Sequence, residues 1–285
     1  MMRTLILAGP WSRCIKKSEA EYIEYVRQIR NSIIGIRIIF SSTDPVNTIP
    51  IGIFDIILSN KIPNNTEYNI NSQNYTSRLY ALNSYKAVEF CKGHSIIRLR
   101  SDLLVKDFDL LLNAFELIEK SDKLLLIDFT EQHNNVLPFN YSDFFVAGSY
   151  NNLLLLFAFS PQRVLISKIS FQPFTSHTMG RTRNFITNEQ FLWFNYFNHD
   201  NSIKKLDTLK GLYYSSKYLH FNLKVINREL LFHFDQKLNA YDSDSKFDFS
   251  VPSSLTKFFI VKLLFIGTLR YYLSSIHRLA SKVFF

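Results

Sequence analysis

The sequence predicts an α/β fold in which helices flank a mostly parallel central sheet. Apolar, β-branched segments alternate with segments of helical periodicity over residues 1–130, and this order joins parallel strands through crossover helices. Hydrophobic residues make up 47% of the 285 residues and charged residues 20%, so a disordered or low-complexity chain is excluded. The two cysteines are too few for a disulfide framework.

The strands and helices of this first half follow from the spacing of the apolar residues. A first strand precedes the turn at Gly9 and Pro10, and Ser18 is a suitable N-cap for the first helix. The later strands end in polar loops. We expect these strands at 33–40, 51–58, 95–102 and 123–128. We expect the helices at 18–30, 69–90 and 107–120.

The second half is less regular. An aromatic strand ends at Gly148 and a helix follows it, while Thr187 and Gln190 form a capping box that opens another helix. We expect these three elements at 141–147, 151–159 and 191–197. The chain is accordingly divided into one domain over 1–250 and a basic, apolar, helical C-terminal segment over 251–285.

The C-terminal segment carries much of the excess positive charge. The formal net charge is +9, and residues 250–285 hold five basic residues and no acidic one. These residues interrupt the apolar runs too often for a spanning helix of about 20 residues. We therefore expect attachment to an anionic membrane surface, with a core or oligomer helix as the alternative. No nucleic-acid partner is expected, because the cations lie on an apolar segment and not in a stripe with stacking aromatics.

The strongest local signal for chemistry is Arg98–Asp102, where a buried strand is expected to end. Ligands of open α/β sheets bind beyond the carboxyl ends of the strands, so an acid there faces the site. Asp102 is suited to a divalent cation, Mg²⁺ or Mn²⁺, that bridges two phosphates. Arg98 and Arg100 are suited to neutralising phosphate charge. The alternative is an aspartate that caps the next turn beside arginines on a solvated face.

Four short motifs occur in an order that resembles a known family. They are Asn71–Leu79, Ile97–Leu103, Tyr141–Gly148 and Ile186–Trp193. Together they look like the ordered motifs of the WavE-type lipopolysaccharide-synthesis proteins, which are regarded as glycosyltransferases of the GT-A type. The match extends over residues 4–200 and is strongest at the Arg-Ser-Asp and Ser-Asp-Phe-Phe motifs. The resemblance implies a GT-A-like domain.

The resemblance also implies a nucleotide-sugar donor that lies across the ends of the first strands. Asp102 then stands in place of the metal-binding Asp-x-Asp motif of related transferases. Arg100 occupies the position two before it, so the paired-carboxylate form is missing. Two alternatives are open: Ser101 and Asp102 hold a divalent cation with one carboxylate and water, or Arg100 replaces part of the cation's charge.

Further donor-binding residues are expected in three places. Gly9 permits a close approach of the backbone to the nucleotide in the first strand-to-helix turn. Asn71, Gln73 and Arg78 lie at the polar start of a helix, which suits a base, ribose or phosphate, with ordinary capping as the alternative. Arg181 belongs to a polar loop that either closes over the diphosphate or is a plain exposed connection.

Two carboxylates are candidates for the general base that removes the proton of the acceptor hydroxyl. Glu189 lies in the first turn of an expected helix, as does the acid of the Glu-Asp motif in inverting GT-A enzymes, and we favour it. Asp143 lies in an expected strand, where apolar neighbours would raise its pKa. The structural alternatives are an interaction of Glu189 with the helix dipole and a buried, hydrogen-bonded Asp143.

These observations predict a glycosyltransferase that moves a sugar from a nucleotide-sugar donor to a growing bacterial surface polysaccharide, either lipopolysaccharide or capsule. The expected acceptor is a saccharide or a lipid-linked saccharide. The expected location is cytoplasmic, peripheral on the inner face of the cell membrane. The alternative is a non-catalytic carbohydrate-binding or assembly protein that retains the fold.

Overall fold

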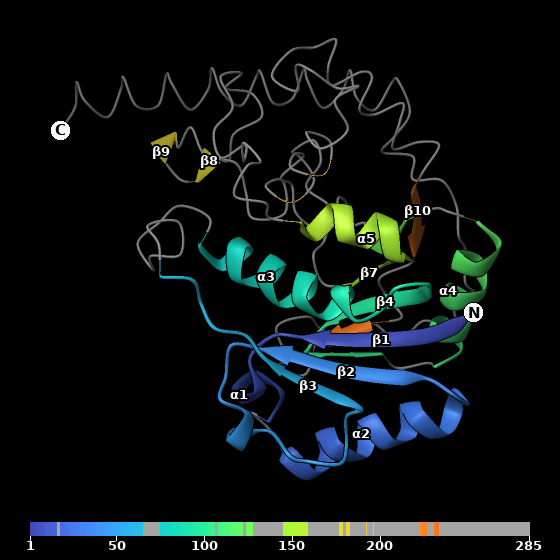
Figure 1. Cartoon of the computed structure of the whole chain (residues 1–285), viewed down its shortest axis with the longest axis horizontal. Coiled ribbons are helices and arrows are strands. Elements are labelled where there is room, and N and C mark those ends of the chain that lie inside the picture. The colour runs from blue at the N-terminus through green and yellow to red at the C-terminus, as the bar shows by residue number, and fades with distance from the viewer. Residues whose placement is uncertain are drawn as a thin grey trace.

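The computed structural model describes most of the N-terminal half of the chain and shorter pieces of the rest (Figure 1). The described residues are 1–15, 18–64, 75–105, 108–121, 124–127, 145–158, 177–178, 181–182, 192, 196, 223–226 and 231–233. The C-terminal segment 251–285 and the capping box at Thr187 and Gln190 lie outside the described residues. The structure therefore tests the first half of the predicted fold.

A mixed, mostly parallel sheet forms the centre of the described part. Its strand order is β10-β6-β7-β4-β1-β2-β3. The strands are β1 (Met2–Ala8), β2 (Arg37–Ser42), β3 (Ile56–Ser59), β4 (His94–Arg100), β6 (Leu124–Ile127), β7 (Phe145–Ser149) and β10 (Leu223–Ile226). β7 runs antiparallel to β4 and β6, and the other neighbouring pairs among these strands are parallel. The predicted α/β class with a mostly parallel sheet is confirmed.

Two small antiparallel sheets and several helices complete the elements that are described. The small sheets pair β5 (Leu103–Val105) with β11 (Leu231–His233), and β8 (His177–Thr178) with β9 (Arg181–Thr182). The helices are α1 (Trp11–Cys14), α2 (Glu19–Ser32), α3 (Tyr75–Glu89), α4 (Asp109–Lys120) and α5 (Tyr150–Phe157), with a 3-10 turn at Val46–Thr48. No helix within the described ranges has both the length and the apolar character needed to cross a membrane.

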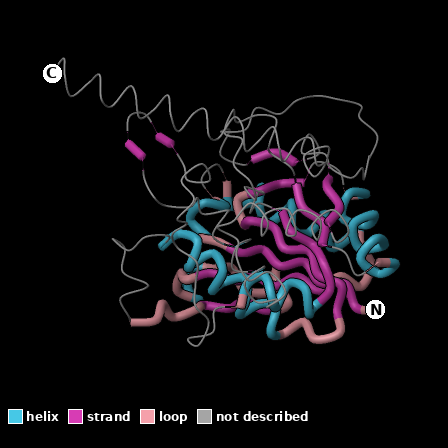
Figure 2. The backbone as a smooth tube through the Cα atoms, turned by 90° about the horizontal axis from the view of Figure 1, so that it is seen from above, coloured by secondary structure: helices cyan, strands magenta, loops and turns pink. Residues whose placement is uncertain are grey.

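Helices cover both faces of the sheet. α2 and α4 pack on one face, where Leu7, Phe40 and Leu99 belong to a large apolar core. α3 and α5 lie against each other on the opposite face. Figure 1 shows the strands between α3 and α2, and Figure 2 shows the strands from above in magenta. Side chains alternate along β4, so Leu99 enters the apolar core while Arg98 lies on the α3 face, where it contacts Ser84.

Trp11 fixes the turn that follows β1. Its ring meets Tyr22, Phe40 and Phe54 edge-on, with centroid distances of 5.5, 5.6 and 6.2 Å. Such aromatic pairs contribute about 0.5–1.5 kcal/mol each beyond the burial of their surface. The backbone N–H of Trp11 also donates to the carboxylate of Asp44, in the loop after β2. The turn between β1 and α1 is therefore held from the α2 side and from the β2 loop.

Two predicted strand starts are wrong, because the chain forms turns there. The helix expected at 18–30 starts as predicted, since Ser18 accepts a hydrogen bond from the N–H of Glu21, but it continues to Ser32. A turn with Gly35 at φ +73° follows, so β2 begins at Arg37 and not at residue 33. In the second case, Ile51 is 90% exposed in a loop, and β3 begins only at residue 56.

The prediction that Gly148 ends its strand is also wrong. β7 continues to Ser149, and Gly148 pairs with Ile96 of β4 inside the sheet. A Cβ atom on Gly148 would lie 2.8 Å from Cδ2 of Leu124. Glycine is required here by the close packing of the strand and not by a turn. The antiparallel direction of β7 was not anticipated by the alternating pattern of the first half.

Both cysteines are buried, and their burial predicts a loss of stability at alkaline pH. Burial raises the pKa of Cys14 to about 12 and that of Cys91 to about 11 from an ordinary value of 9.0. Between pH 9 and the raised pKa the unfolded chain loses these protons while the folded chain keeps them, so stability falls as pH rises. At pH 10 we expect a loss of about 1 kcal/mol for each thiol, measured by urea unfolding from about pH 8.5 to 10. The double variant Cys14→Ala and Cys91→Ala should show a shallower pH slope, and equal slopes would contradict the prediction.

Candidate functional site

The order of the strands defines one edge of the sheet as the place for a ligand. β2 and β3 lie on one side of β1, whereas β4 lies on its other side, so the direction of winding reverses between β1 and β4. Open α/β sheets bind ligands at such a switch point, beyond the carboxyl ends of the strands. Here these ends are Ala8–Pro10 and Arg100–Asp102. They are joined directly, because the N–H of Ser101 donates to the carbonyl of Ala8 over 3.0 Å.

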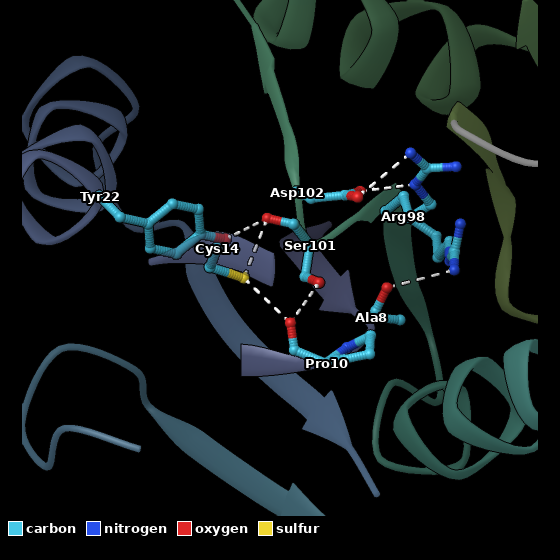
Figure 3. A network of polar contacts seen from close by, with 8 residues as sticks. Ala8, Pro10, Cys14, Tyr22, Arg98, Ser101 and Asp102 are labelled. Atoms are coloured by element: carbon cyan, nitrogen blue, oxygen red, sulfur yellow. Dashed lines mark hydrogen bonds and ion pairs between the residues drawn. The ribbon is translucent and has the colours of Figure 1, made fainter. Parts of the chain in front are cut away.

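Gly9 lets the two strand ends approach each other closely, and Figure 3 shows its neighbours Ala8 and Pro10 near Ser101. Its φ is +146°, and a Cβ atom there would lie 2.5 Å from Oγ of Ser101. Both observations require glycine at this position, since the backbone conformation is one that other residues rarely adopt. The N–H of Gly9 donates to the carbonyl of Ser41, which ties the turn to β2 as well. The close approach that the structure shows is to Ser101, and the expected approach of this turn to a nucleotide stays a prediction.

The carbonyl of Ser101 is held from the opposite side by two buried residues. The hydroxyl of Tyr22 donates to this carbonyl over 2.6 Å, and the thiol of Cys14 lies 3.3 Å from it. Figure 3 shows both side chains converging on Ser101 from α1 and α2. Burial raises the pKa of Tyr22 well above its ordinary value, so this hydroxyl keeps its proton and acts as a fixed donor. The peptide that carries Asp102 is thereby immobilised.

Asp102 forms an ion pair with Arg100, two residues before it. Nε of Arg100 contacts Oδ1 at 2.5 Å and Nη2 contacts Oδ2 at 3.1 Å, so each carboxylate oxygen meets one guanidinium N–H. The Asp102 side chain is 3% exposed and that of Arg100 is 20% exposed. The pair has the bidentate geometry in which arginine binds carboxylates most strongly. It places a guanidinium at the strand-end edge of the sheet.

Arg98 is fully buried beneath α3. Its Nε donates to Oγ of Ser84 over 3.1 Å, its Nη2 lies 3.4 Å from the carbonyl of Ala8, and its guanidinium carbon lies 3.5 Å from the ring centroid of Tyr80. These contacts join α3 to the end of β1. The alternative of arginines on a solvated face is wrong for Arg98, whereas the Arg100 side chain is partly exposed. Direct contact of Arg98 with a donor stays a prediction, and the contacts described here position Ala8.

A second polar cluster, which was not predicted from the sequence, lies beside the switch point. Oγ of Ser41 donates to the carbonyl of Asn83 over 2.7 Å, and Nδ2 of Asn60 lies 2.9 Å from that hydroxyl and 2.8 Å from Oδ1 of Asn83. Ser41 comes from β2, Asn60 directly follows β3, and Asn83 belongs to α3. The polar residues at the ends of both strands were visible in the sequence. Ligands bind beyond the carboxyl ends of strands, and this principle, which pointed to Asp102, also points to Ser41 and Asn60.

The remaining predicted site residues are only partly placed. Arg78 lies on α3, the helix that covers Arg98, and is 8% exposed. Arg181 belongs to β9, and its side chain is not described. Four others lie outside the described residues, namely Asn71, Gln73, Asp143 and Glu189. The structure thus brings together Gly9, Arg98, Arg100 and Asp102, and leaves the others as predictions.

A divalent cation at Asp102 does not fit the residues that are described. Mg²⁺ and Mn²⁺ require oxygen ligands, and both carboxylate oxygens of Asp102 contact the guanidinium of Arg100. Within the described ranges no three His, Cys, Asp or Glu side chains are grouped so that they could hold a metal ion. A cation would have to displace Arg100 from its carboxylate.

The fold and this edge define an α/β protein with a cluster of charged and polar residues at a topological switch point. Comparison with protein-family models gives no match, and comparison with curated proteins gives no significant match. The resemblance to the WavE-type family therefore stays a prediction based on four motifs.

Proposed function

We propose that the protein is a glycosyltransferase with a GT-A-like domain, which uses a nucleotide-sugar donor bound across the ends of β1 and β4. The observation that carries the proposal is the meeting of Gly9, Arg100 and Asp102 at the switch point of a mostly parallel sheet. A glycine turn admits a ligand close to the backbone, and a guanidinium suits the oxygens of a diphosphate. The three residues belong to two strands that are far apart in the sequence, so their convergence is a property of the fold.

The elements on either side of the switch point offer positions for the nucleoside and for the sugar of the donor. The cluster of Ser41, Asn60 and Asn83 lies on the β2 side of Gly9. Ser41 and Asn83 are buried and bonded to each other, so Asn60, which holds both, is the residue suited to a ribose or a base. On the other side, the chain turns at Asp102 directly into β5 of a separate small sheet. A donor with its nucleoside toward β2 and its diphosphate at Arg100 would place the sugar toward that sheet.

Nucleotide binding and sugar release by the full chain test the proposal. Calorimetric titration with UDP, GDP and dTDP identifies the nucleotide, and release of sugar from the corresponding donor measures chemistry. We expect one nucleotide to bind and its sugar donor to be cleaved by the wild-type protein. Binding without release would favour the non-catalytic alternative, and binding of none of the three would contradict the proposal.

The general base is proposed to be Glu189, with Asp143 as the competing candidate. Glu189→Gln should lower kcat about a hundredfold or more and leave donor affinity nearly unchanged, because a base acts on the acceptor hydroxyl and not on the donor. The measurement is sugar transfer at saturating donor, beside titration of the nucleotide. If Asp143→Asn is inactive and Glu189→Gln is active, the two roles are reversed.

The acceptor is proposed to be a saccharide or lipid-linked saccharide of a bacterial surface polysaccharide, reached from the cytoplasmic face of the membrane. This location is supported by the five basic residues of the C-terminal segment, which are Lys257, Lys262, Arg270, Arg278 and Lys282. Each basic residue near an anionic surface contributes about 1 kcal/mol, and this part weakens with salt. Burial of the apolar residues between them adds a part that salt does not weaken.

Truncation after Ser254 tests the role of this segment. The shortened chain should remain monodisperse, bind the nucleotide as the full chain does, and no longer sediment with vesicles that contain acidic lipid. The full chain should sediment with them, less strongly as salt is raised. Aggregation of the shortened chain would instead identify the segment as a core or oligomer element.

A further inference from the structure

We propose that Asn60 binds the base of the donor nucleotide, with its side-chain oxygen Oδ1 accepting a hydrogen bond from a ring N–H of that base. This inference rests on the proposed function, since it names the part of the nucleotide that reaches the end of β3. It is carried by the cluster of Ser41, Asn60 and Asn83, whose contacts determine which atoms of the Asn60 side chain are engaged.

The contacts of Ser41 determine which way the Asn60 amide is turned. A serine hydroxyl has one proton, and Oγ of Ser41 donates it to the backbone carbonyl of Asn83 over 2.7 Å. Toward Asn60 this hydroxyl can therefore only accept, so the atom of Asn60 that lies 2.9 Å from it is the nitrogen Nδ2. The same Nδ2 donates its second proton to Oδ1 of Asn83 over 2.8 Å. Both N–H groups of the amide are thereby used inside the cluster.

The oxygen Oδ1 is the polar atom of the Asn60 side chain that remains for a ligand. Among the residues that the structure describes, the hydrogen bonds of Asn60 run through its backbone N–H and Nδ2, and none of them engages Oδ1. Asn60 is half-buried, whereas Ser41 is fully buried and Asn83 is 5% exposed. An amide oxygen accepts hydrogen bonds and cannot donate them. The ligand group that binds here therefore has to be a donor.

The Asn60 amide is fixed before a ligand arrives. Its backbone N–H donates to the carbonyl of Ser42 over 2.7 Å, directly after the last paired residues of β2 and β3. Its two side-chain contacts come from β2 and from α3, so three bonds to two other elements hold the residue. Little conformational entropy is then lost when Oδ1 accepts a hydrogen bond from a ligand.

The order of the strands favours the base over the ribose as the group that Asn60 binds. The diphosphate is proposed to lie at the ends of β1 and β4, and Asn60 follows β3, two strands beyond β1. Neighbouring strands lie about 4.8 Å apart, so Asn60 is about 10 Å across the sheet from the end of β1. In a nucleoside diphosphate the ribose is next to the phosphates, and the base is the far end of the molecule. The base is therefore the part that reaches Asn60.

The three nucleotides that test the proposed function all carry a suitable donor. Uracil and thymine have a ring N–H at N3, and guanine has one at N1, on the edge by which proteins read a base. Methylation of that nitrogen removes the donor and leaves the rest of the nucleotide unchanged. N3-methyl-UDP, N3-methyl-dTDP and N1-methyl-GDP are therefore matched probes of one hydrogen bond.

The test titrates the full chain with whichever of UDP, GDP and dTDP binds, and with its methylated analogue. The wild-type protein should bind the analogue about tenfold more weakly, as expected for the loss of one hydrogen bond to a fixed partner. Asn60→Ala should weaken binding of the parent nucleotide by about the same factor. For Asn60→Ala, the Kd values of parent and analogue should agree within about twofold, because the acceptor is already gone.

Asn113→Ala is the matched control. Asn113 is a half-buried asparagine on α4, which packs on the face of the sheet opposite α3. This variant should change each Kd by less than about twofold and keep the tenfold difference between parent and analogue. Should Asn60→Ala fail to fold by circular dichroism, Asn60→Ser carries the comparison, because it keeps a hydroxyl in the cluster and lacks Oδ1.

The outcomes separate the base, the ribose and a purely structural cluster. An equal methylation penalty in wild-type and Asn60→Ala protein overturns the inference, because the ring N–H then binds elsewhere. Analogues without the 2′- or the 3′-hydroxyl test the ribose: if their penalty disappears in Asn60→Ala and the methylation penalty stays, Asn60 binds the ribose and the inference is wrong. If Asn60→Ala leaves every Kd unchanged, the cluster is structural and the inference is also wrong.

These outcomes are distinguishable from failure of the proposed function. Each of them requires that a nucleotide binds, so each leaves the glycosyltransferase proposal standing. Absence of binding by all three parent nucleotides overturns both.

Discussion

Asp102→Asn is expected to lower sugar transfer at least about a hundredfold while the fold stays intact. The asparagine keeps the size of the side chain and one oxygen acceptor, but it loses the charge that holds Arg100 through two contacts. Without that charge Arg100 is held less firmly beside the diphosphate, whose charge develops in the transition state. A hundredfold loss corresponds to about 2.7 kcal/mol, within the range that one preorganised charge contact supplies.

The measurement is the rate of sugar transfer at saturating donor, with circular dichroism and thermal unfolding as checks on the fold. Asp55→Asn is the matched control, because Asp55 also forms a carboxylate–arginine pair, with Arg30 at 3.0 Å. Asp55 precedes β3 and so lies at the amino ends of the parallel strands, away from the switch point. The control should lower stability and leave turnover unchanged. A folded Asp102→Asn protein with near-normal turnover would remove Asp102 from the mechanism.

Gly9→Ala is expected to destabilise the protein by about 2–4 kcal/mol and to weaken nucleotide binding. Part of this cost is backbone strain at φ +146°, and part is the contact of the new Cβ with Oγ of Ser101 at 2.5 Å. Ser101 is fully buried and its neighbours hold it in place, so only rotation of its hydroxyl relieves the contact. The new methyl group also lies where the donor is proposed to approach the backbone. Urea unfolding and nucleotide titration measure the two effects.

Two further variants divide this cost into its parts. Gly93→Ala introduces a Cβ at φ +78° with nothing within 4 Å, so it should show backbone strain alone, about 1–2 kcal/mol. Adding Ser101→Ala to Gly9→Ala removes the hydroxyl that the new Cβ meets and should recover the steric part. If Gly9→Ala costs no more than Gly93→Ala, the close approach of the two strand ends does not constrain this position.

The fold class and the strand-end position of the candidate site were predictable, because both depend on short-range patterns in the sequence. Helical and strand periodicity are local properties of the chain, and they predicted α2, α4, β1, β4, β6 and the end of α3 within a few residues of their observed bounds. Asp102 and Gly9 were found because polar and glycine residues at strand ends are also visible locally. The starts of β2 and β3 were mispredicted because runs of isoleucine favour a strand wherever they occur, even in a turn with an exposed Ile51.

The long-range contacts among the residues of the candidate site could not be predicted from the sequence. Tyr22 and Ser101 are 79 positions apart, and Asn60 meets Asn83 from another element 23 positions away. No periodicity relates such residues, since their contact depends on how the strands are ordered and how the helices cross them. The antiparallel direction of β7 could not be predicted for the same reason, because it is set by pairing with β4 and β6.

The sequence by itself determined that the chain folds as an α/β domain and that glycine, arginine and aspartate stand at the ends of its first and fourth strands. Only the tertiary structure decided what these residues do to one another. It buried Arg98 under α3, placed both oxygens of Asp102 against Arg100, and fixed the intervening peptide through Tyr22. The physical reason is that local pattern sets secondary structure, whereas burial and charge pairing depend on which distant segments the sheet brings together.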